Sequence, residues 1–431
     1  MTRATGPLTI LAIMVIAGAI GLVWSPRPEP GAPRPPSPTT AAPPSPVVTE
    51  LDARIEAQTR FAETSRSWVD WDVVASLLME RAAASGSLDD LGRASDALAR
   101  AFSLADPGAG PHLRSAILAA RLHRLDDCEA MLDAFDGYAL TTRQDRETAR
   151  SLRADLAFFR GDYASARRGY ESLVEEEPDP THLFSLARLE WSTGHAERAA
   201  ERLDQAEALA TGDGLQGFLA LARAYLARER GQLPEAARAA ERALALRPAD
   251  RGTAMFLAEI RLDQGELAAA WALVSRALAA DDPRVHEVAA RVARARGDLI
   301  ALAEHREAAT RAYDALFARF PEAIAGHATL HYLRFEDAEY ALEMARVDAE
   351  ARPFGEPRAR LALALLRAGR PTEARAEIDA VLTSGWDTAE AHAIAAAIFA
   401  ANGDARASAE EALAEALAPG AMARIGELAR P

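Results

Sequence analysis

The apolar and polar positions from about residue 70 onward follow a helix-turn-helix pattern that returns along the chain. One copy, residues 160–178, reads RGDYASARRGYESLVEEEP. Its glycine is followed five residues later by alanine, four residues after that by tyrosine, and eight residues further on by proline. Alanine, leucine, arginine and glutamate dominate the chain and aromatic residues are only 6% of it, which is typical of helices rather than strands. The pattern and the composition together predict an all-α protein.

Ten positions along the chain correspond to the turn glycine of this segment. Successive positions are separated by 32 to 39 residues, and a period in this range indicates a repeat architecture. Eight of the ten are Gly86, Gly161, Gly194, Gly231, Gly265, Gly297, Gly369 and Gly403. In the other two units Leu125 and Glu336 align with the glycine.

Small side chains recur at fixed distances from the turn. Five residues after it, allowing three extra residues in the first unit, stand Ala94, Ala130, Ala166, Ala199, Ala236, Ala270, Ala341 and Ala374. Seven residues before it stand Ala154, Ala187, Ala224, Ala258, Ala290, Ala362 and Ala396. Antiparallel helices approach most closely where small residues face each other. We therefore expect each helix pair to cross at these alanines, with the glycine accepting the positive φ that ends the first helix.

The repeat unit resembles the tetratricopeptide repeat. It has roughly 34 residues, with small residues at its eighth and twentieth positions, and RALALRP at residues 242–248 closes one copy. The resemblance covers residues 72–419 as about ten units. It implies a right-handed superhelical solenoid of antiparallel helix pairs.

The two ends of such an array need caps, because each unit alone leaves one face unburied. Residues 49–71 are predicted to form a capping helix, with Trp68 and Trp71 against the apolar face of the first unit. Residues 420–431 are predicted to form a C-terminal cap or tail.

Residues 8–24 form a run of seventeen residues without a charge, near the short end of what spans a bilayer as a helix. An uncleaved signal anchor, a cleaved signal peptide and a buried helix are the three interpretations. A segment that is apolar all round argues against the buried helix. The small residues 17–19, where cleavage could occur, lie inside the apolar run. We therefore predict a single N-terminal transmembrane helix that follows a short tail, residues 1–7.

Residues 25–48 contain ten of the 24 prolines, which predicts an extended polyproline linker. The basic residues around residues 8–24 give little bias in orientation, but a seven-residue tail is most easily left in the cytoplasm. The expected localisation is a single-pass bacterial cell membrane protein with the repeat domain extracytoplasmic. Secretion after cleavage of the signal is the alternative.

Charge and composition exclude several functions. The formal net charge of −15 argues against nonspecific nucleic-acid binding, because neutralising phosphates requires a basic surface. Every basic residue is arginine, so Schiff-base chemistry and lysine-based phosphate loops are excluded. Cys128 is the only cysteine, so no intrachain disulfide can form.

The sequence offers one weak candidate for chemistry. His327 and His331 stand at i and i+4, as two metal ligands on one helical face would. However, the motif is HATLH rather than HExxH, and no third ligand is evident. We therefore predict a noncatalytic protein with no metal site and no cofactor.

The resemblance implies that the first helices of the units line a concave groove that binds protein or peptide partners. The second, fifth, ninth, twelfth and thirteenth places of a unit face this groove in the family. In this chain those places include Phe184, Arg188, Trp191, Phe218, Tyr225, Arg228, Glu259, Arg291 and Arg294. Aromatic residues and arginines are frequent anchors of interfaces. Packing between neighbouring helices and pairing with glutamates are the alternative roles for these side chains.

The function implied is a membrane-anchored scaffold in a bacterial envelope that binds partners through the groove. A regulatory or assembly subunit of an envelope enzyme complex is the alternative. Some members of the family bind acidic chaperone tails through a lysine and asparagine clamp. This chain contains no lysine and has no asparagine at the groove positions, so it should not bind in that way.

Overall fold

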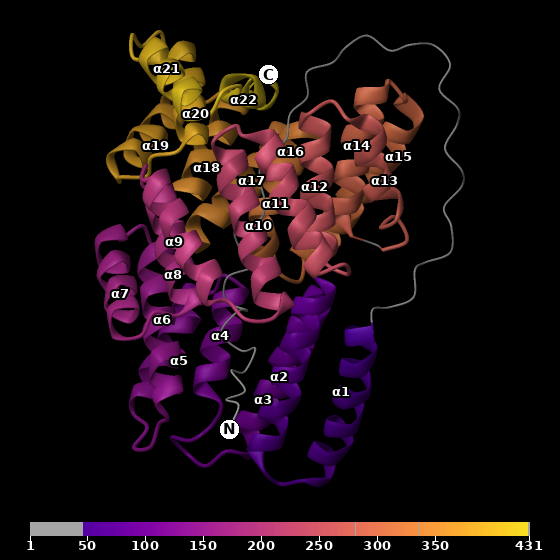
Figure 1. Ribbon diagram of the computed structural model, residues 1–431, viewed down its shortest axis with the longest axis vertical. Coiled ribbons are helices and arrows are strands. Elements are labelled where there is room, and N and C mark those ends of the chain that lie inside the picture. The colour runs from indigo at the N-terminus through magenta and orange to yellow at the C-terminus, as the bar shows by residue number, and fades with distance from the viewer. Residues whose placement is uncertain (1–45, 281, 336, 430–431) are drawn as a thin grey trace. The chain divides into compact units, whose positions relative to one another are not determined.

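The regular elements of the described chain are all helices (Figure 1). The computed structural model describes residues 46–280, 282–335 and 337–429. Within these ranges the helices α2 to α21 form ten consecutive pairs, with α1 before them and α22 after them. The prediction of an all-α solenoid of about ten helix pairs is therefore confirmed.

The chain divides into two compact units, and the division falls inside α8, after Leu189. In the first unit the second helix of each pair packs against the first, and each pair contacts the next. Its helices are α1 (Pro46–Thr64), α2 (Trp68–Ser85), α3 (Leu88–Leu104), α4 (His112–Arg121), α5 (Leu125–Asp136), α6 (Arg143–Phe159), α7 (Tyr163–Glu176) and most of α8 (Pro180–Ser192).

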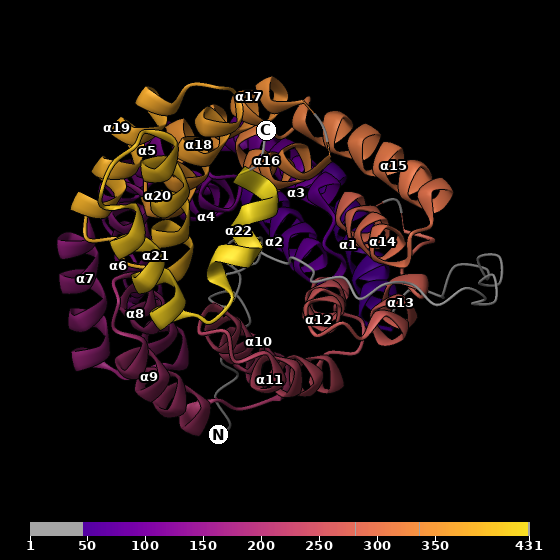
Figure 2. The ribbon, with the colours of Figure 1, turned by 90° about the horizontal axis from the view of Figure 1, so that it is seen from above.

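The second unit contains the remaining helices (Figure 2). They are α9 (Ala196–Leu209), α10 (Asp213–Glu229), α11 (Leu233–Leu246), α12 (Arg251–Asp263), α13 (Leu267–Ser275), α14 (Pro283–Arg296), α15 (Leu299–Phe317), α16 (Pro321–Phe335), α17 (Ala338–Ala351), α18 (Gly355–Arg367), α19 (Pro371–Thr383), α20 (Ala389–Ala401), α21 (Ala407–Leu417) and α22 (Ala421–Ala429). Within this unit α22 packs against α16, α18, α20 and α21.

Residues 160–178 show why the pattern produces a helix pair. Gly161 adopts a φ of 79° and ends α6, and the Asp162 side chain then caps α7 by accepting a hydrogen bond from the Ser165 amide at 2.9 Å. A methyl group added at Gly169 would lie only 2.7 Å from the Ala154 Cβ atom. The two helices therefore cross where their side chains are smallest.

One repeat has a different register from the one that we predicted. In the second repeat, which consists of α4 and α5, His123 takes the positive φ, 59°, that glycine takes in other repeats. The turn therefore lies two residues before Leu125. Five residues after His123 is Cys128, which is completely buried, whereas Ala130 is exposed. The small residue at this helix crossing is therefore the cysteine. Burial also raises the pKa of its thiol to about 12.

The N-terminal boundary also differs from the expectation. Helix α1 begins at Pro46, inside the stretch that the sequence analysis assigned to the proline-rich linker. Proline is favourable in the first turn of a helix, because it lacks only an amide that would have no partner there. Trp68 and Trp71 lie in α2 rather than in the preceding helix.

The predicted single-pass membrane localisation is wrong on the evidence of the fold. Among the described residues, no helix combines the length and the apolar character needed to cross a bilayer. Residues 1–45, which include the expected tail, anchor and most of the linker, lie outside the described residues.

The two ends of the second unit are in direct contact. The Asp387 amide, between α19 and α20, donates a hydrogen bond to the Ser192 carbonyl at 3.0 Å. Thr193 and Asp387 form an isolated parallel bridge. Gly231, in the turn after α10, packs against Pro419, which precedes α22. The second unit therefore closes on itself.

Candidate functional site

The first helices of successive pairs in the second unit form what we call the inner face: α10, α12, α14, α16, α18 and α20. In Figure 2, α10, α12, α14, α16 and α18 lie nearer to α22 than their partner helices α11, α13, α15, α17 and α19 do. Neighbouring first helices also contact each other directly, as α12 contacts α14, α16 contacts α18, and α18 contacts α20. This arrangement places one face of each first helix in the same concave surface.

Charged side chains run along this surface from α10 to α20. We call the set the charge network. Its members are Arg228, Glu229, Glu259, Asp263, Arg284, Glu287, Arg291, Arg334, Asp348, Arg352, Glu356, Arg360 and Glu390. Asp348 and Arg352 come from the end of α17, and the other members come from the first helices.

Arg228 links the first two helices of the network. Its guanidinium donates to the Glu259 Oε2 atom at 3.0 Å and to the Asp263 Oδ2 atom at 2.8 Å. The guanidinium also lies 5.2 Å above the centre of the Phe256 ring, which stacks on Tyr225 at 3.8 Å. The arginine is thus held by both charge and aromatic contacts.

The network continues through α14, α16 and α18. Arg291 lies 3.5 Å from Asp263, and Arg334 forms an ion pair with Glu287. Arg360 pairs with Glu356 at 2.5 Å, and its Nε atom lies 3.5 Å from the Glu390 Oε1 atom. Neighbouring helices therefore share charges along the surface.

The carboxylates of the network differ in their acidity. Burial by itself would raise the pKa of Glu259, but Arg284 and Arg228 lower it to about 2. For Asp263 burial outweighs the attraction of Arg228 and Arg291, and the pKa rises to about 6. Burial also raises the pKa values of Glu229, Glu356 and Glu390. A further cation near these carboxyl groups would therefore stabilise their ionised form.

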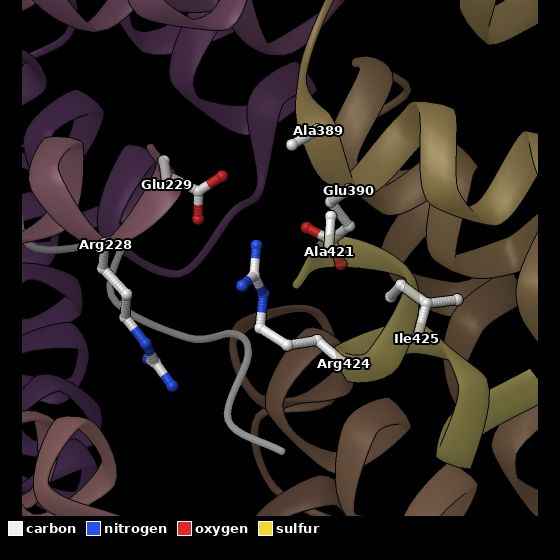
Figure 3. A pocket seen from close by; sticks show the side chains of 7 residues that line it. All are labelled: Arg228, Glu229, Ala389, Glu390, Ala421, Arg424 and Ile425. Atoms are coloured by element: carbon white, nitrogen blue, oxygen red, sulfur yellow. The ribbon is translucent and has the colours of Figure 1, made fainter. Parts of the chain in front are cut away.

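Helix α22 brings such a cation. Figure 3 shows the pocket between α10, α20 and α22, with Arg424 directed toward Glu229 and Glu390. The lining residues are Arg228, Glu229, Ala389, Glu390, Ala421, Arg424 and Ile425. The Arg424 guanidinium donates a hydrogen bond to the Pro419 carbonyl at 3.2 Å. Burial raises the pKa values of the Glu229 and Glu390 carboxyl groups, and the charge of Arg424 opposes that rise in both.

The groove residues expected from the sequence fall into two sets. Tyr225, Arg228, Glu259 and Arg291 lie together in or beside the charge network. Phe218 is buried near the start of α10. Arg294 is exposed, with its guanidinium 4.4 Å above the Phe335 ring.

The remaining expected residues lie on α8. Phe184 is buried and Trp191 is half-buried. Arg188 is 1% exposed, and its Nη2 atom donates to the Asp155 Oδ1 atom at 2.6 Å and to the Tyr170 hydroxyl at 2.7 Å. Its guanidinium lies 4.4 Å above the Phe158 ring. Arg188 therefore belongs to the packing between α6, α7 and α8 in the first unit.

The two histidines of α16 point to different environments. Burial, together with Arg284, lowers the pKa of His327 to about 3, so the imidazole is neutral at ordinary pH. His331 is completely buried, and its Nε2 atom lies 2.8 Å from the Thr310 hydroxyl. Within the part of the chain that the structure describes, no three His, Cys, Asp or Glu side chains converge in a way that could hold a metal ion.

The sequence analysis did not name most of the network residues. Most of these occupy repeat places that it had assigned to the groove. Arg284, Glu356 and Glu390 stand thirteen residues before their turn positions, as Phe218 does. Glu229, Asp263 and Arg334 stand two residues before theirs. Applying the same places to every unit would have found them. Arg424 lies after the last repeat, so it has no repeat place from which its position could be predicted.

The chain was compared with protein-family models, with curated proteins and with solved structures. No protein-family model and no curated protein matches the sequence. Among solved structures, the human IFIT1 dimer with m7Gppp-AAAA matches with 14% identity and a TM-score of 0.40, covering 86% of this chain and 94% of that one.

A tetratricopeptide repeat protein from Parabacteroides merdae matches with 15% identity and a TM-score of 0.38, covering 70% of this chain and 99% of that one. Yeast Tom70 matches with 13% identity and a TM-score of 0.34, covering 84% and 96%. The chain is thus similar to tetratricopeptide repeat proteins of solved structure.

Proposed function

We propose that the protein is a noncatalytic scaffold that binds a partner protein or peptide along the inner face of the second unit. The observation that carries the proposal is the charge network itself. Most of its arginines are almost completely buried, and the ion pairs join α10 to α12, α12 to α14, α14 to α16, and α18 to α20.

The helix pairs of the solenoid have a source of stability apart from this network. The helix pairs are already held by apolar contacts and by the alanine crossings, and apolar side chains of similar volume stabilise an interior at least as well as buried ion pairs do. A concave surface that keeps arginines and stacked aromatic rings carries residue types that often anchor interfaces. Arginine can also bind carboxylate groups of a partner by paired hydrogen bonds.

Site-directed photo-crosslinking in the native host tests this proposal. A photo-reactive amino acid is suitable because the chain has no lysine for amine-reactive reagents. The inner position is Leu366, which is half-buried and stands three residues before its turn glycine, as Arg228 does. The matched outer position is Arg238, which is exposed on the second helix of its pair.

We expect the inner position to capture one or a few partners reproducibly and the outer position to capture none of them. Mass spectrometry of the adducts would identify the partner segments. Capture of the same proteins with equal yield at both positions would contradict binding along the inner face.

A further inference from the structure

We propose that α22 occupies the place of the partner on the inner face, and that the pocket between Glu229 and Glu390 receives a basic side chain of that partner. The inference rests on the proposed function and makes it more specific. The occupant it predicts is a short amphipathic helix that carries an arginine or lysine in the position of Arg424.

The first argument is the way in which α22 is held. Its buried apolar side chains, among those described, are Ala421, Ile425 and Leu428, at 1%, 2% and 1% exposure. They stand at i, i+4 and i+7, so they form one stripe of the helix, and Arg424 lies beside it. Helix α22 contacts α16, α18 and α20, which are helices of the inner face, and also α21, which precedes it. An amphipathic helix lying in an apolar and charged groove is a common form of peptide recognition.

The second argument is that few side chains hold α22, since three of those described are buried. By contrast, α12 buries eight side chains and α14 buries nine. Full burial of a large aliphatic side chain contributes about 1.5–3 kcal/mol, so Ile425 and Leu428 hold α22 only modestly. A partner helix that offers similar contacts over a greater length can therefore displace it.

The third argument is charge. Arg424 faces Glu229 and Glu390 across the pocket (Figure 3). Of the neighbouring arginines, Arg228 pairs with Glu259 and Asp263. Arg360 pairs with Glu356 at 2.5 Å and lies 3.5 Å from Glu390. Without α22, the half-buried Glu229 and Glu390 would lose the Arg424 guanidinium that faces them both, and Glu390 would keep Arg360 at 3.5 Å. Such a pocket favours a guanidinium or ammonium group and disfavours an acidic one.

The connection to α21 explains how α22 can leave the groove. Pro419 and Gly420 form the link, and Gly420 has a φ of 81°. The Glu415 side chain caps the start of α22 by accepting hydrogen bonds from the Gly420 and Met422 amides at 2.7 and 2.9 Å. Rotation at this link moves α22 without unfolding the repeats. Because α22 is attached to the chain, it competes with an external helix as a ligand at high effective concentration.

The experiment measures binding of the chain's own C-terminal segment added as a separate peptide. The probe is a fluorescein-labelled peptide with the sequence of residues 419–429, PGAMARIGELA. Fluorescence anisotropy compares its binding to the unsubstituted full chain and to the full chain with Ile425→Asp. The substitution places a carboxylate where Ile425 is buried, so α22 should leave the groove.

We expect the peptide to bind the Ile425→Asp chain at least about tenfold more tightly than the unsubstituted chain, because the attached helix no longer competes. A peptide with alanine in place of the arginine should bind about tenfold more weakly, which isolates the contribution of the basic group. Glu390→Gln in the Ile425→Asp background should weaken the arginine peptide and leave the alanine peptide almost unchanged.

A second variant keeps the test decisive if Ile425→Asp disturbs folding. Arg424→Glu leaves the apolar stripe intact but places a third carboxylate in the pocket, which should also release α22. Hydrogen exchange of the α22 amides reports the release in both variants. Equal binding of the peptide to released and unsubstituted chains, or equal binding of the arginine and alanine peptides, would overturn the inference. Inner-face crosslinks at Leu366 would then still support the scaffold without the proposed role of α22.

Discussion

Buried arginines occur in both units, but their surroundings differ. Arg188 in the first unit meets Asp155, Tyr170 and Phe158, which come from the two helices that precede its own. Arg228 in the second unit belongs to ion pairs that join α10, α12, α14 and α16, and a further pair joins α18 to Glu390, which lines a pocket with Arg228. The comparison teaches that a buried arginine marks a candidate site only when its ion pairs extend along a surface that another chain could contact.

The largest effect should come from breaking the compact cluster of the first unit. Arg188→Met keeps much of the side-chain volume but leaves the Asp155 carboxylate buried without its cation. Removing one partner of a buried ion pair costs about 3–5 kcal/mol. Urea unfolding of the full chain should show this loss, and hydrogen exchange should locate it in α6, α7 and α8.

The matched control is Arg168→Ala, because Arg168 is exposed on α7 in the same unit. This substitution should change the free energy of unfolding by less than about 0.5 kcal/mol. Equal losses for Arg168→Ala and Arg188→Met would mean that the cluster does not hold the unit together.

A somewhat smaller effect should come from the carboxylates of the second unit. The Glu259 pKa falls from 4.5 to about 2 because Arg284 and Arg228 outweigh burial, which corresponds to roughly 3 kcal/mol of stabilisation. The contribution is present above about pH 4.5 and is lost as the pH falls toward 2. Glu259→Gln should remove it, and urea unfolding at pH 7 and at lower pH would measure the difference.

Ionisation of Asp263 should affect the free energy of unfolding in the opposite direction to ionisation of Glu259. Its folded pKa is raised from 3.8 to about 6, chiefly by burial, so its ionisation opposes folding. Stability should therefore fall as the pH rises from about 4 to 6, and Asp263→Asn should flatten this part of the profile. An unchanged slope between pH 4 and 6 in that variant would contradict the assignment.

An intermediate effect is expected at the close crossing of α6 and α7. Gly169→Ala would place a methyl group 2.7 Å from the Ala154 Cβ atom and push Tyr170 away from Asp155. Overpacking of this kind costs about 1–3 kcal/mol. Thermal unfolding should show the loss. Gly214→Ala, which meets no atom within 4 Å, is the control and should leave stability almost unchanged.

The smallest effect should come from the contact between the ends of the second unit. His392 lies between the carboxylates of Asp387 and Glu410, at 2.9 and 2.5 Å. Burial lowers the pKa of His392, but these hydrogen bonds raise it overall. The stabilisation is complete below about pH 6.5 and is lost as the pH rises through the folded pKa.

Hydrogen exchange of the Asp387 amide, which bonds to the Ser192 carbonyl, can follow this contact. Its protection should decrease with rising pH beyond the intrinsic change in exchange rate. His392→Gln should make protection independent of pH between about 6 and 8. The prediction fails if the variant keeps the pH dependence of the unsubstituted chain.

The sequence predicted the fold because its signals are local. The glycines with positive φ and the alanines at the crossings act within one helix pair, so their spacing alone predicted ten pairs. The predicted register of the second repeat was wrong, because His123 and Cys128 occupy the places that glycine and alanine occupy in other repeats. The membrane localisation relied on residues 8–24, and the fold provides no span among the described helices.

The candidate site was only partly predictable. Four of the named residues, Tyr225, Arg228, Glu259 and Arg291, lie in or beside the charge network because repeat places fix which side of a helix they face. The sequence analysis favoured aromatic residues and arginines at the groove places. It therefore did not name carboxylates such as Asp263 and Glu390, which stand at equivalent places. The meeting of Arg424 with Glu229 depends on how far the second unit curves. No spacing within a single repeat encodes that curvature.

The closure of the second unit has a consequence for how it unfolds. An open array of repeats, in which each touches only its neighbours, loses structure progressively from its ends. Here the Ser192 carbonyl meets the Asp387 amide and Gly231 meets Pro419, so repeats distant in the sequence support each other. These contacts give the array properties of a ring: the repeats at its two ends are held by distant repeats as well as by their neighbours, and mechanical tension on Pro419 is shared with the turn after α10 rather than with α21 alone.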